Sequence, residues 1–301
     1  MGDHVVEVTH PDRVLFPDAG ITKGEVVDYY RRVAEVMLPH LRGRPLMLQR
    51  FPRGIDASGF YMKDVPDHFP DWVHTAAIPR RERGGTIEQA FLCDQPAALV
   101  YLANQGTLTF HVWPTRADRL DTPDLMVFDL DPPDGDVTSL RDAARSLRDV
   151  LQELSLVPFL QTSGSKGYHV VVPLDGTTDL DAVRDVARGV AEYVAGHDPD
   201  RLTTAQRKSK RGDRIFIDTN RNAYAQTFAA PYAIRARPGA PVATPIDWHE
   251  LGRAEPTSYT VGNLFRRLGQ KHDPWADLHE HATGLDNARG RLAELVEAAA
   301  R

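Results

Sequence analysis

The chain of 301 residues carries 36 Lys and Arg against 42 Asp and Glu, a formal net charge of −6, and 42% of its residues are hydrophobic. This composition is typical of a globular protein; no apolar stretch approaches the length of a membrane span, and "MGDHVVEVTH" has no signal-peptide pattern, so we expect a cytoplasmic location. The single cysteine, Cys93, excludes an internal disulfide and a zinc cluster, and we interpret it as a core residue.

The first ninety residues predict a smaller N-terminal lobe. A helix is expected near 22–37, and a segment punctuated by Gly and Pro follows at 42–61. We expect this lobe to cover about 1–92, a larger core to cover about 93–285 and a helix to form the C-terminal end at 286–301.

Strands and helices alternate in the predicted core. "LMVFDLD" (125–131) is typical of a buried strand, and Asp136 or Thr138 can cap the helix that follows, with apolar residues at helical spacing up to Leu154. The elements expected next are strand 157–163, a turn, strand 168–174, a helix over 180–194 and strand 214–220. The pattern predicts the α+β class.

Three carboxylates accompany these strands. Asp129 and Asp131 are two apart, so they face the same side of their strand and repel each other. If Asp218 lies on a neighbouring strand, the three oxygen ligands suit Mg²⁺ or Mn²⁺ and the two-metal arrangement of nucleotidyl transfer. For the Asp-x-Asp pair alone, an alternative stays open: Asp131 starts the Pro132–Pro133 turn and Asp218 caps a loop.

The turn "SGSKG" (163–167) offers the hydroxyls of Ser163 and Ser165, the amine of Lys166 and backbone N–H groups as a cradle for a triphosphate. It lacks the spacing of a Walker A motif, and a plain hairpin turn is the alternative. His111 and His169 lie in apolar segments where core histidines are common. Arg235 also follows an apolar segment. A buried arginine needs an anion as its partner, and a salt bridge at the surface is the alternative.

Five segments in order, "HVWPTR", "FDLDPP", "SGSKGYHVVVPL", "RIFIDTNRN" and "YAIRARPGAPVATPIDW", closely resemble the polymerase domain of bacterial non-homologous end-joining ligase D, within the archaeo-eukaryotic primase superfamily. The resemblance covers nearly the whole chain. It implies a single primase-polymerase domain over 1–301, with a primase-like catalytic core of mixed and antiparallel sheet flanked by helices and a smaller N-terminal lobe.

The resemblance also implies roles for individual residues. The metal ligands are Asp129, Asp131 and Asp218, and His111 is an essential active-site histidine. The nucleotide-binding residues are Ser163, Lys166, His169 and Arg235, and the hydroxyl in the turn adds Ser165 to them. The DNA-binding residues are Arg13, Lys23, Gln49, Phe60 and Tyr61, to which we add Arg50, Lys208, Lys210 and Arg211 along the template backbone. Gln49 stands where the family has a lysine of the 5′-phosphate pocket, which argues against tight recognition of that phosphate.

The function implied is a nucleotidyltransferase that uses two divalent ions, Mn²⁺ or Mg²⁺. It adds nucleotides, with a preference for ribonucleotides, to primer 3′-hydroxyls during gap filling and end processing in end joining or excision repair. The expected partners are gapped or recessed DNA, NTP or dNTP, a separate ATP-dependent DNA ligase and the end-binding protein Ku, in the bacterial nucleoid and without a membrane. The chain has no Lys-x-Asp-Gly ligase motif, so we expect a stand-alone polymerase or an excised domain.

Two other functions fit parts of the sequence. A phosphatase of the haloacid dehalogenase type also has an Asp-x-Asp pair at a strand end, but it needs Thr or Val soon after, where this chain has Pro132 and Pro133. A non-catalytic module that binds nucleic-acid ends would keep the basic segments and lose the carboxylates. Retention of all three aspartates favours the enzyme.

Overall fold

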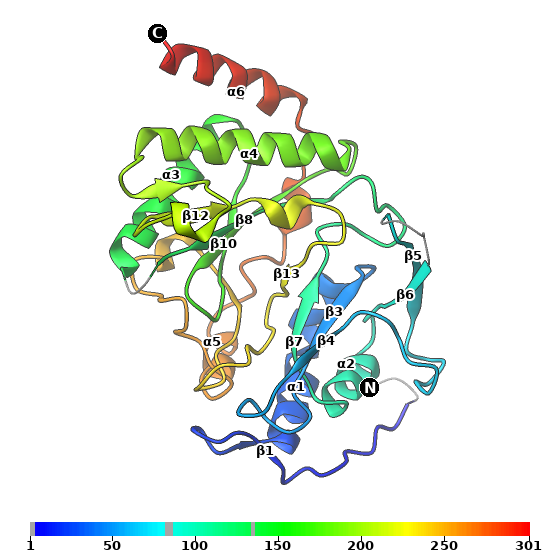
Figure 1. Ribbon diagram of the computed structural model, residues 1–301. Coiled ribbons are helices and arrows are strands. Elements are labelled where there is room, and N and C mark those ends of the chain that lie inside the picture. Colours follow the sequence, from blue (N-terminus) through cyan, green and yellow to red (C-terminus); the bar gives the residue numbers. More distant parts are fainter. Residues whose placement is uncertain (1–3, 82–86, 134–135) are drawn as a thin grey trace. The chain divides into compact units, whose positions relative to one another are not determined.

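The computed structural model describes residues 4–81, 87–133 and 136–301 (Figure 1). The chain divides into two compact units. The first unit comprises Met1–Asp118, Thr227–Thr244 and Tyr259–Lys271, and the second comprises Arg119–Gln226, Pro245–Ser258 and His272–Arg301. The lobe boundary expected near residue 92 falls inside the first unit, because a strand beyond it, at residues 107–112, pairs with a strand at 46–50.

The first unit is built on a sheet of strand order β13-β7-β3-β6-β5, with β4 paired to β3. Its strands are β3 (Leu46–Arg50), β4 (Phe60–Met62), β5 (Thr75–Pro79), β6 (Ile87–Phe91), β7 (Thr107–Val112) and β13 (Phe228–Ala229), beside a small pair, β1 (Val14–Phe16) and β2 (Ile21–Thr22). Its helices are α1 (Lys23–Leu41), α2 (Pro96–Asn104) and α5 (Leu264–Leu268). The expected helix near 22–37 is confirmed as α1, which begins with a capping box between Thr22 and Glu25.

The second unit is built on a sheet of strand order β11-β12-β8-β10-β9-β14. Its strands are β8 (Leu125–Asp131), β9 (Phe159–Thr162), β10 (Tyr168–Pro173), β11 (Leu202–Thr203), β12 (Ile215–Asp218) and β14 (Thr244–Ile246). Its helices are α3 (Val137–Glu153), α4 (Leu180–His197) and α6 (Asp286–Ala299), with the 3₁₀ turns η1 (Lys208–Lys210), η2 (Asn220–Asn222), η3 (Trp248–Glu250) and η4 (Leu278–His281). The strands and helices expected from residue 125 to 220 are therefore confirmed, as is the C-terminal helix.

Helices α3 and α4 pack against each other and against β8, as Figure 1 shows for α4 above the labelled strands. Asp136 caps α3, since its side chain accepts hydrogen bonds from the N–H groups of Thr138 and Ser139 at 3.0 Å each. Along β8, the fully buried Phe128 and Leu130 lie on one face of the sheet. The carboxylates at positions 129 and 131 consequently lie on the opposite face.

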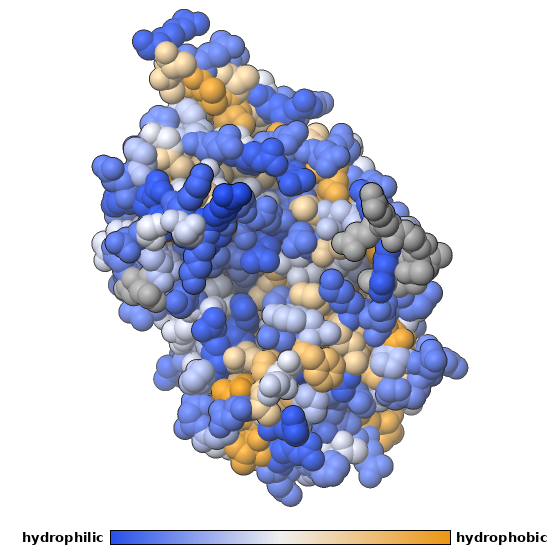
Figure 2. Space-filling model, in the orientation of Figure 1, coloured by the Kyte–Doolittle hydropathy of each residue, from blue (hydrophilic) through white to orange (hydrophobic). Residues whose placement is uncertain are grey.

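Hydrophilic side chains predominate on the face shown in Figure 2, with apolar side chains in small groups between them. Within the described residues, no helix combines the length and the apolar character that crossing a membrane requires. Cys93 is fully buried, as expected of a core residue, and its burial raises the pKa of the thiol far above the usual range.

Candidate active site

A row of polar side chains crosses four adjacent strands of the second unit. Register pairs Gln161 on β9 with His169 on β10, His169 with Asp129 on β8, and Asp129 with Asp218 on β12. Residues paired across antiparallel strands point to the same face, so the four side chains lie in one line. The metal site predicted from the sequence required Asp218 to lie on a strand next to that of Asp129. The structure confirms this position.

Three carboxylates converge at one end of this row. Each of Asp129, Asp131 and Asp218 offers an oxygen within 4.8 Å of the others. Asp129 and Asp218 are 8% and 7% exposed, and Asp131 ends β8. Burial, followed by repulsion from Asp129, raises the pKa of Asp131 to about 7. All the ligand atoms are carboxylate oxygens, a set that fits a hard divalent cation such as Mg²⁺ or Mn²⁺.

Asp218 also has a local structural role, as one alternative from the sequence anticipated. Its Oδ1 accepts a hydrogen bond from the N–H of Asn220 at 2.9 Å, which stabilises the turn after β12. The oxygen that lies near Arg221 is its other one, Oδ2. The capping bond therefore orients the carboxylate and leaves its second oxygen directed at the cluster.

His169 is nearly fully buried, as a core histidine would be, yet it contacts the cluster directly. Its Nε2 lies 3.5 Å from Asp129 Oδ1, and its Nδ1 lies 3.1 Å from the side-chain nitrogen of Gln161. A donor at Nδ1 leaves the proton of a neutral ring on Nε2, facing the carboxylate. The Gln161 contact therefore orients His169 toward Asp129, a role for Gln161 that the sequence did not reveal.

Arg221 is a further member of the cluster that sequence analysis missed. Its Nη2 lies 3.2 Å from Asp129 Oδ2 and 3.6 Å from Asp218 Oδ2. Burial would lower its pKa, but the three carboxylates together raise the pKa of Arg221 above its ordinary value. The only signal in the sequence was its position three residues after Asp218.

The neighbour of Arg221 fixes it to the strand. Asn222 is fully buried; its side-chain oxygen accepts from Val127 N at 2.7 Å, and its nitrogen donates to Val127 O at 2.7 Å and Thr219 O at 2.9 Å. These bonds tie η2 to β8. The backbone that carries Arg221 is thereby held beside the carboxylates.

The turn "SGSKG" lies next to the end of β8. Ser163 Oγ accepts hydrogen bonds from Ser165 N at 3.2 Å and Gly167 N at 3.1 Å, so this side chain shapes the turn. A Cβ atom on Gly167 would come within 1.7 Å of the carbonyl oxygen of Leu130, which only glycine avoids. Ser165 is partly exposed and Lys166 is exposed. The turn that carries this amine and this hydroxyl therefore packs, through Gly167, against the residue that precedes Asp131.

His111 belongs to the first unit, on β7. Register pairs Met47 with His111, Gln49 with Thr109, and Gln49 with Tyr61 of β4, so these side chains share one face of the sheet. The rings of Tyr61 and His111 are 6.0 Å apart. Tyr61 is 56% exposed. An exposed aromatic ring and a nearly buried histidine thus form one surface with Gln49.

Phe60 and Arg50 lie together on the opposite face of that strand pair. Phe60 is 46% exposed, and the guanidinium of Arg50 lies 5.3 Å from its ring centre. Arg50 Nε donates to the carbonyl of Gln105 at 2.8 Å. Arg50, expected to follow the template backbone, is therefore engaged with its own chain in this structure.

Other basic residues of the predicted DNA surface also bind the protein's own backbone. Lys23 is buried and its Nζ donates to Thr9 O at 2.6 Å, while Arg13 donates to Pro52 O at 2.8 Å. Burial, followed by the charge of Arg13, lowers the pKa of Lys23. Arg211 donates to the carbonyls of the loop before it, at residues 205 and 206, and stacks on Phe216.

Three predicted residues complete the set. Lys208 and its neighbour Lys210 bound the exposed turn η1 in the second unit. Arg235, in the first unit, is half-buried, and its N–H donates to Pro241 O at 2.7 Å. This bond fixes the backbone of Arg235 at the end of the apolar segment that precedes it.

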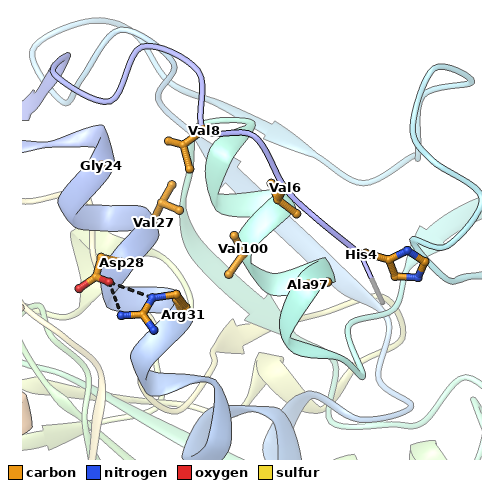
Figure 3. A pocket seen from close by; sticks show the side chains of 9 residues that line it. All are labelled: His4, Val6, Val8, Gly24, Val27, Asp28, Arg31, Ala97 and Val100. Atoms are coloured by element: carbon orange, nitrogen blue, oxygen red, sulfur yellow. Dashed lines mark hydrogen bonds and ion pairs between the residues drawn. The ribbon is translucent and has the colours of Figure 1, made fainter. Parts of the chain in front are cut away.

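A cavity of the first unit is lined by other residues, among them Gly24, the neighbour of Lys23 (Figure 3). The N-terminal segment carrying Val6 and Val8 crosses it, with Val27 of α1 and Val100 of α2 below. Most of its wall is apolar, and Asp28 and Arg31, which also line it, pair with each other at 2.6 Å. A second acidic group, Asp247 with His249 and Glu250, is explained by the capping box of η3.

Comparison with known proteins identifies the family. The model of the LigD primase-polymerase domain matches residues 22–275. The multifunctional end-joining protein LigD of Mycobacterium bovis is 36% identical over 283 residues, which cover 89% of this chain and 36% of that protein. LigD of Pseudomonas aeruginosa is 33% identical over 279 residues, 90% of this chain and 32% of that protein. The chain thus spans about a third of the length of these relatives.

The fold gives the same result. The polymerase domain of Mycobacterium tuberculosis ligase D, solved in complex with DNA, superposes with a TM-score of 0.85 and 32% sequence identity, covering 92% of this chain and 99% of that domain. The mixed and antiparallel sheets flanked by helices are those expected from the sequence. On both grounds the chain belongs to the LigD primase-polymerase domain family.

Proposed function

We propose that this chain adds nucleotides to the 3′-hydroxyl of a DNA primer, with a preference for ribonucleotides, in gap filling and end processing. Membership of the family makes it a nucleotidyltransferase of the polymerase and primase type. The observation that carries the proposal is the convergence of Asp129, Asp131 and Asp218 within 4.8 Å. A module that only bound DNA ends would gain nothing from three mutually repelling carboxylates, two of which are buried.

The three carboxylates would hold two divalent ions, Mn²⁺ or Mg²⁺. When bound, such ions activate the primer hydroxyl and neutralise charge on the triphosphate. His169 orients Asp129, and Asn220 orients Asp218 through the bond to its Oδ1. The protein therefore presents its ligand oxygens in a fixed arrangement, which lowers the cost of ordering them at each turnover.

Four further residues are assigned to the incoming nucleotide. Lys166 and Ser165 extend from the turn whose shape Ser163 maintains, and we assign them to the triphosphate. Arg235 can bind a phosphate in bidentate fashion, and His111 is assigned to the nucleotide's sugar. A protein can distinguish a 2′-hydroxyl through a hydrogen bond to a polar side chain, and His111 is a polar residue that is 9% exposed.

The template would stack on exposed aromatic rings. Phe60 and Tyr61 leave about half of their surface accessible, an unusual exposure for aromatic residues unless they bind a partner. The charges of Arg13, Lys23, Arg50, Lys208 and Arg211 would attract the DNA backbone. Because Arg13 and Lys23 already bind backbone oxygens and Gln49 is neutral, we infer weak recognition of a downstream 5′-phosphate.

The cellular role follows from the relatives. Their names describe end-joining DNA repair, and we propose that this chain acts in the same process in the bacterial nucleoid. The names also describe multifunctional proteins, and this chain covers about a third of their length. A separate ATP-dependent ligase and Ku are the partners we propose for sealing and holding the ends.

Primer extension tests the proposal. Asp129→Asn and Asp218→Asn should each abolish nucleotide addition with Mn²⁺ or Mg²⁺, while circular dichroism remains that of the unmutated protein. Asp185→Asn is the matched control, because Asp185 is an exposed carboxylate on α4 paired with Arg188. Comparison of ribo- and deoxynucleotides measures the sugar preference. Substantial synthesis by folded Asp129→Asn protein would refute the assignment, and DNA binding without synthesis by the unmutated protein would identify a binding module.

A further inference from the structure

We propose that Arg221 is a built-in counterion of the carboxylate cluster, which stabilises the metal-free protein and is displaced when the first divalent ion binds. The inference rests on the proposed function in one respect, namely that the three carboxylates bind metal. It adds a residue that competes with the metal and thereby sets the concentration of ion at which the site fills.

The carboxylates cannot relieve their repulsion by moving apart. Asp129 and Asp218 are direct partners on neighbouring strands, and β8 lies between β10 and β12 in the sheet. Hydrogen bonds on both sides of β8 hold this spacing. In the absence of metal, the remaining means of lowering the electrostatic energy are protonation or a nearby positive charge.

Arg221 supplies that charge to two carboxylates at once. Its Nη2 lies 3.2 Å from Asp129 Oδ2 and 3.6 Å from Asp218 Oδ2, and its Nε lies 3.3 Å from Asp129 Oδ2. Both carboxylates are about nine-tenths buried, so solvent screens these pairs less than it screens surface pairs. The guanidinium is held there by the bonds of Asn222 to Val127, which fix the backbone of η2.

The side chain can nevertheless leave. About one third of its surface is exposed, in contrast to the carboxylates, so the guanidinium can move toward solvent while its backbone stays in place. A divalent cation and a guanidinium repel each other, and both would need the same oxygens of Asp129 and Asp218. Metal binding therefore has to displace Arg221 from at least one of these oxygens. The lost attraction between Arg221 and the carboxylates costs free energy, and this cost lowers the metal affinity.

Mn²⁺ binding without nucleotide or DNA tests the competition. Isothermal titration of Mn²⁺ should give a dissociation constant about tenfold lower for Arg221→Gln than for the unmutated protein, because one opposing charge is gone. Arg221→Lys keeps the charge and should stay within about threefold of the unmutated value. Arg188→Gln removes the same charge from an exposed pair on α4, with Asp185 at 3.5 Å, and should leave the constant unchanged.

Thermal unfolding supplies a second measurement. In EDTA, Arg221→Gln should melt at a lower temperature than Arg188→Gln, and Mn²⁺ should raise its melting temperature by more than it raises that of the unmutated protein. A purely structural role would lower the melting temperature equally with and without Mn²⁺, and would overturn the proposal. Equal or weaker Mn²⁺ affinity of folded Arg221→Gln would also overturn it while leaving the proposed function intact. Absence of Mn²⁺ binding in every variant, the unmutated protein included, would overturn the proposed function and this inference together.

Discussion

Replacing Gly167 with alanine should disturb the strand that carries Asp129 and Asp131. Gly167 precedes β10, and a Cβ atom at this position would lie 1.7 Å from the carbonyl oxygen of Leu130. Atoms in contact lie no closer than about 3 Å, so the turn and the end of β8 would have to separate by roughly 1 Å or more. Both neighbours of Leu130 are predicted metal ligands.

The expected losses of stability and of activity follow from this displacement. Forcing a methyl group into a packed site costs about 1–3 kcal/mol of folding free energy, and displacing reacting groups by 1 Å can lower the rate by about a hundredfold. Equilibrium denaturation measures the first effect and primer extension the second. We expect Gly167→Ala to be less stable by about this amount and to lose most of its activity even where it is fully folded.

Gly196→Ala is the matched control. Gly196 lies in α4, and a Cβ atom there would meet nothing within 4 Å. Alanine in a helix is favoured over glycine by about 0.5–1 kcal/mol, so this variant should be slightly more stable and fully active. Unmutated stability and activity of Gly167→Ala would show that β8 and the turn accommodate the methyl group, and would refute the reasoning.

Four other outcomes are expected. Asn222→Ala should lower the unfolding free energy by about 2–4 kcal/mol, because the N–H and C=O of Val127 both lose a buried partner; denaturation showing less than about 1 kcal/mol would contradict this. Tyr61→Ala should change stability by no more than about 0.5 kcal/mol but weaken single-stranded template binding, measured by anisotropy, by about 1–3 kcal/mol. Gln49→Lys should increase the preference for DNA with a downstream 5′-phosphate and steepen the slope of log affinity against log salt concentration by about one unit. A strong preference already present in the unmutated protein would contradict this prediction. Because burial raises the pKa of the Cys93 thiol, a thiol reagent should modify it only as the protein unfolds, and rapid labelling of folded protein would contradict its place in the core.

Local patterns predicted the second unit well and the first unit poorly. The apolar run before Asp129 and the helical spacing after Asp136 identify β8 and α3, because burial imposes a simple period on each element. Strands β3 and β4 were not predicted, since they are short and separated by Gly and Pro residues that are equally typical of loops. Strand β3 also pairs with β7, which lies far along the chain, and local periodicity carries no information about such a partner.

The candidate site shows the same limit. The two-residue spacing placed Asp129 and Asp131 on one face, but only the register of β12 could place Asp218 opposite Asp129. Arg221 resembled any exposed basic residue of a loop. Its position beside the carboxylates depends on Asn222, whose hydrogen bonds to Val127 hold the turn against β8. An asparagine in a sequence does not reveal which groups its side chain will bind.

The positions of the carboxylates are determined by backbone contacts on both sides of β8. On one side Gly167 packs against the carbonyl of Leu130, and on the other the side chain of Asn222 bonds both backbone groups of Val127. Neither residue carries a charge or offers a ligand to a metal. Each fixes the short segment between them, which contains Asp129, at a spacing that repulsion alone would not maintain. Packing and hydrogen bonding of the strand therefore supply the free energy that holds the like charges together. The guanidinium of Arg221 then neutralises part of the negative charge of carboxylates whose positions these contacts already fix.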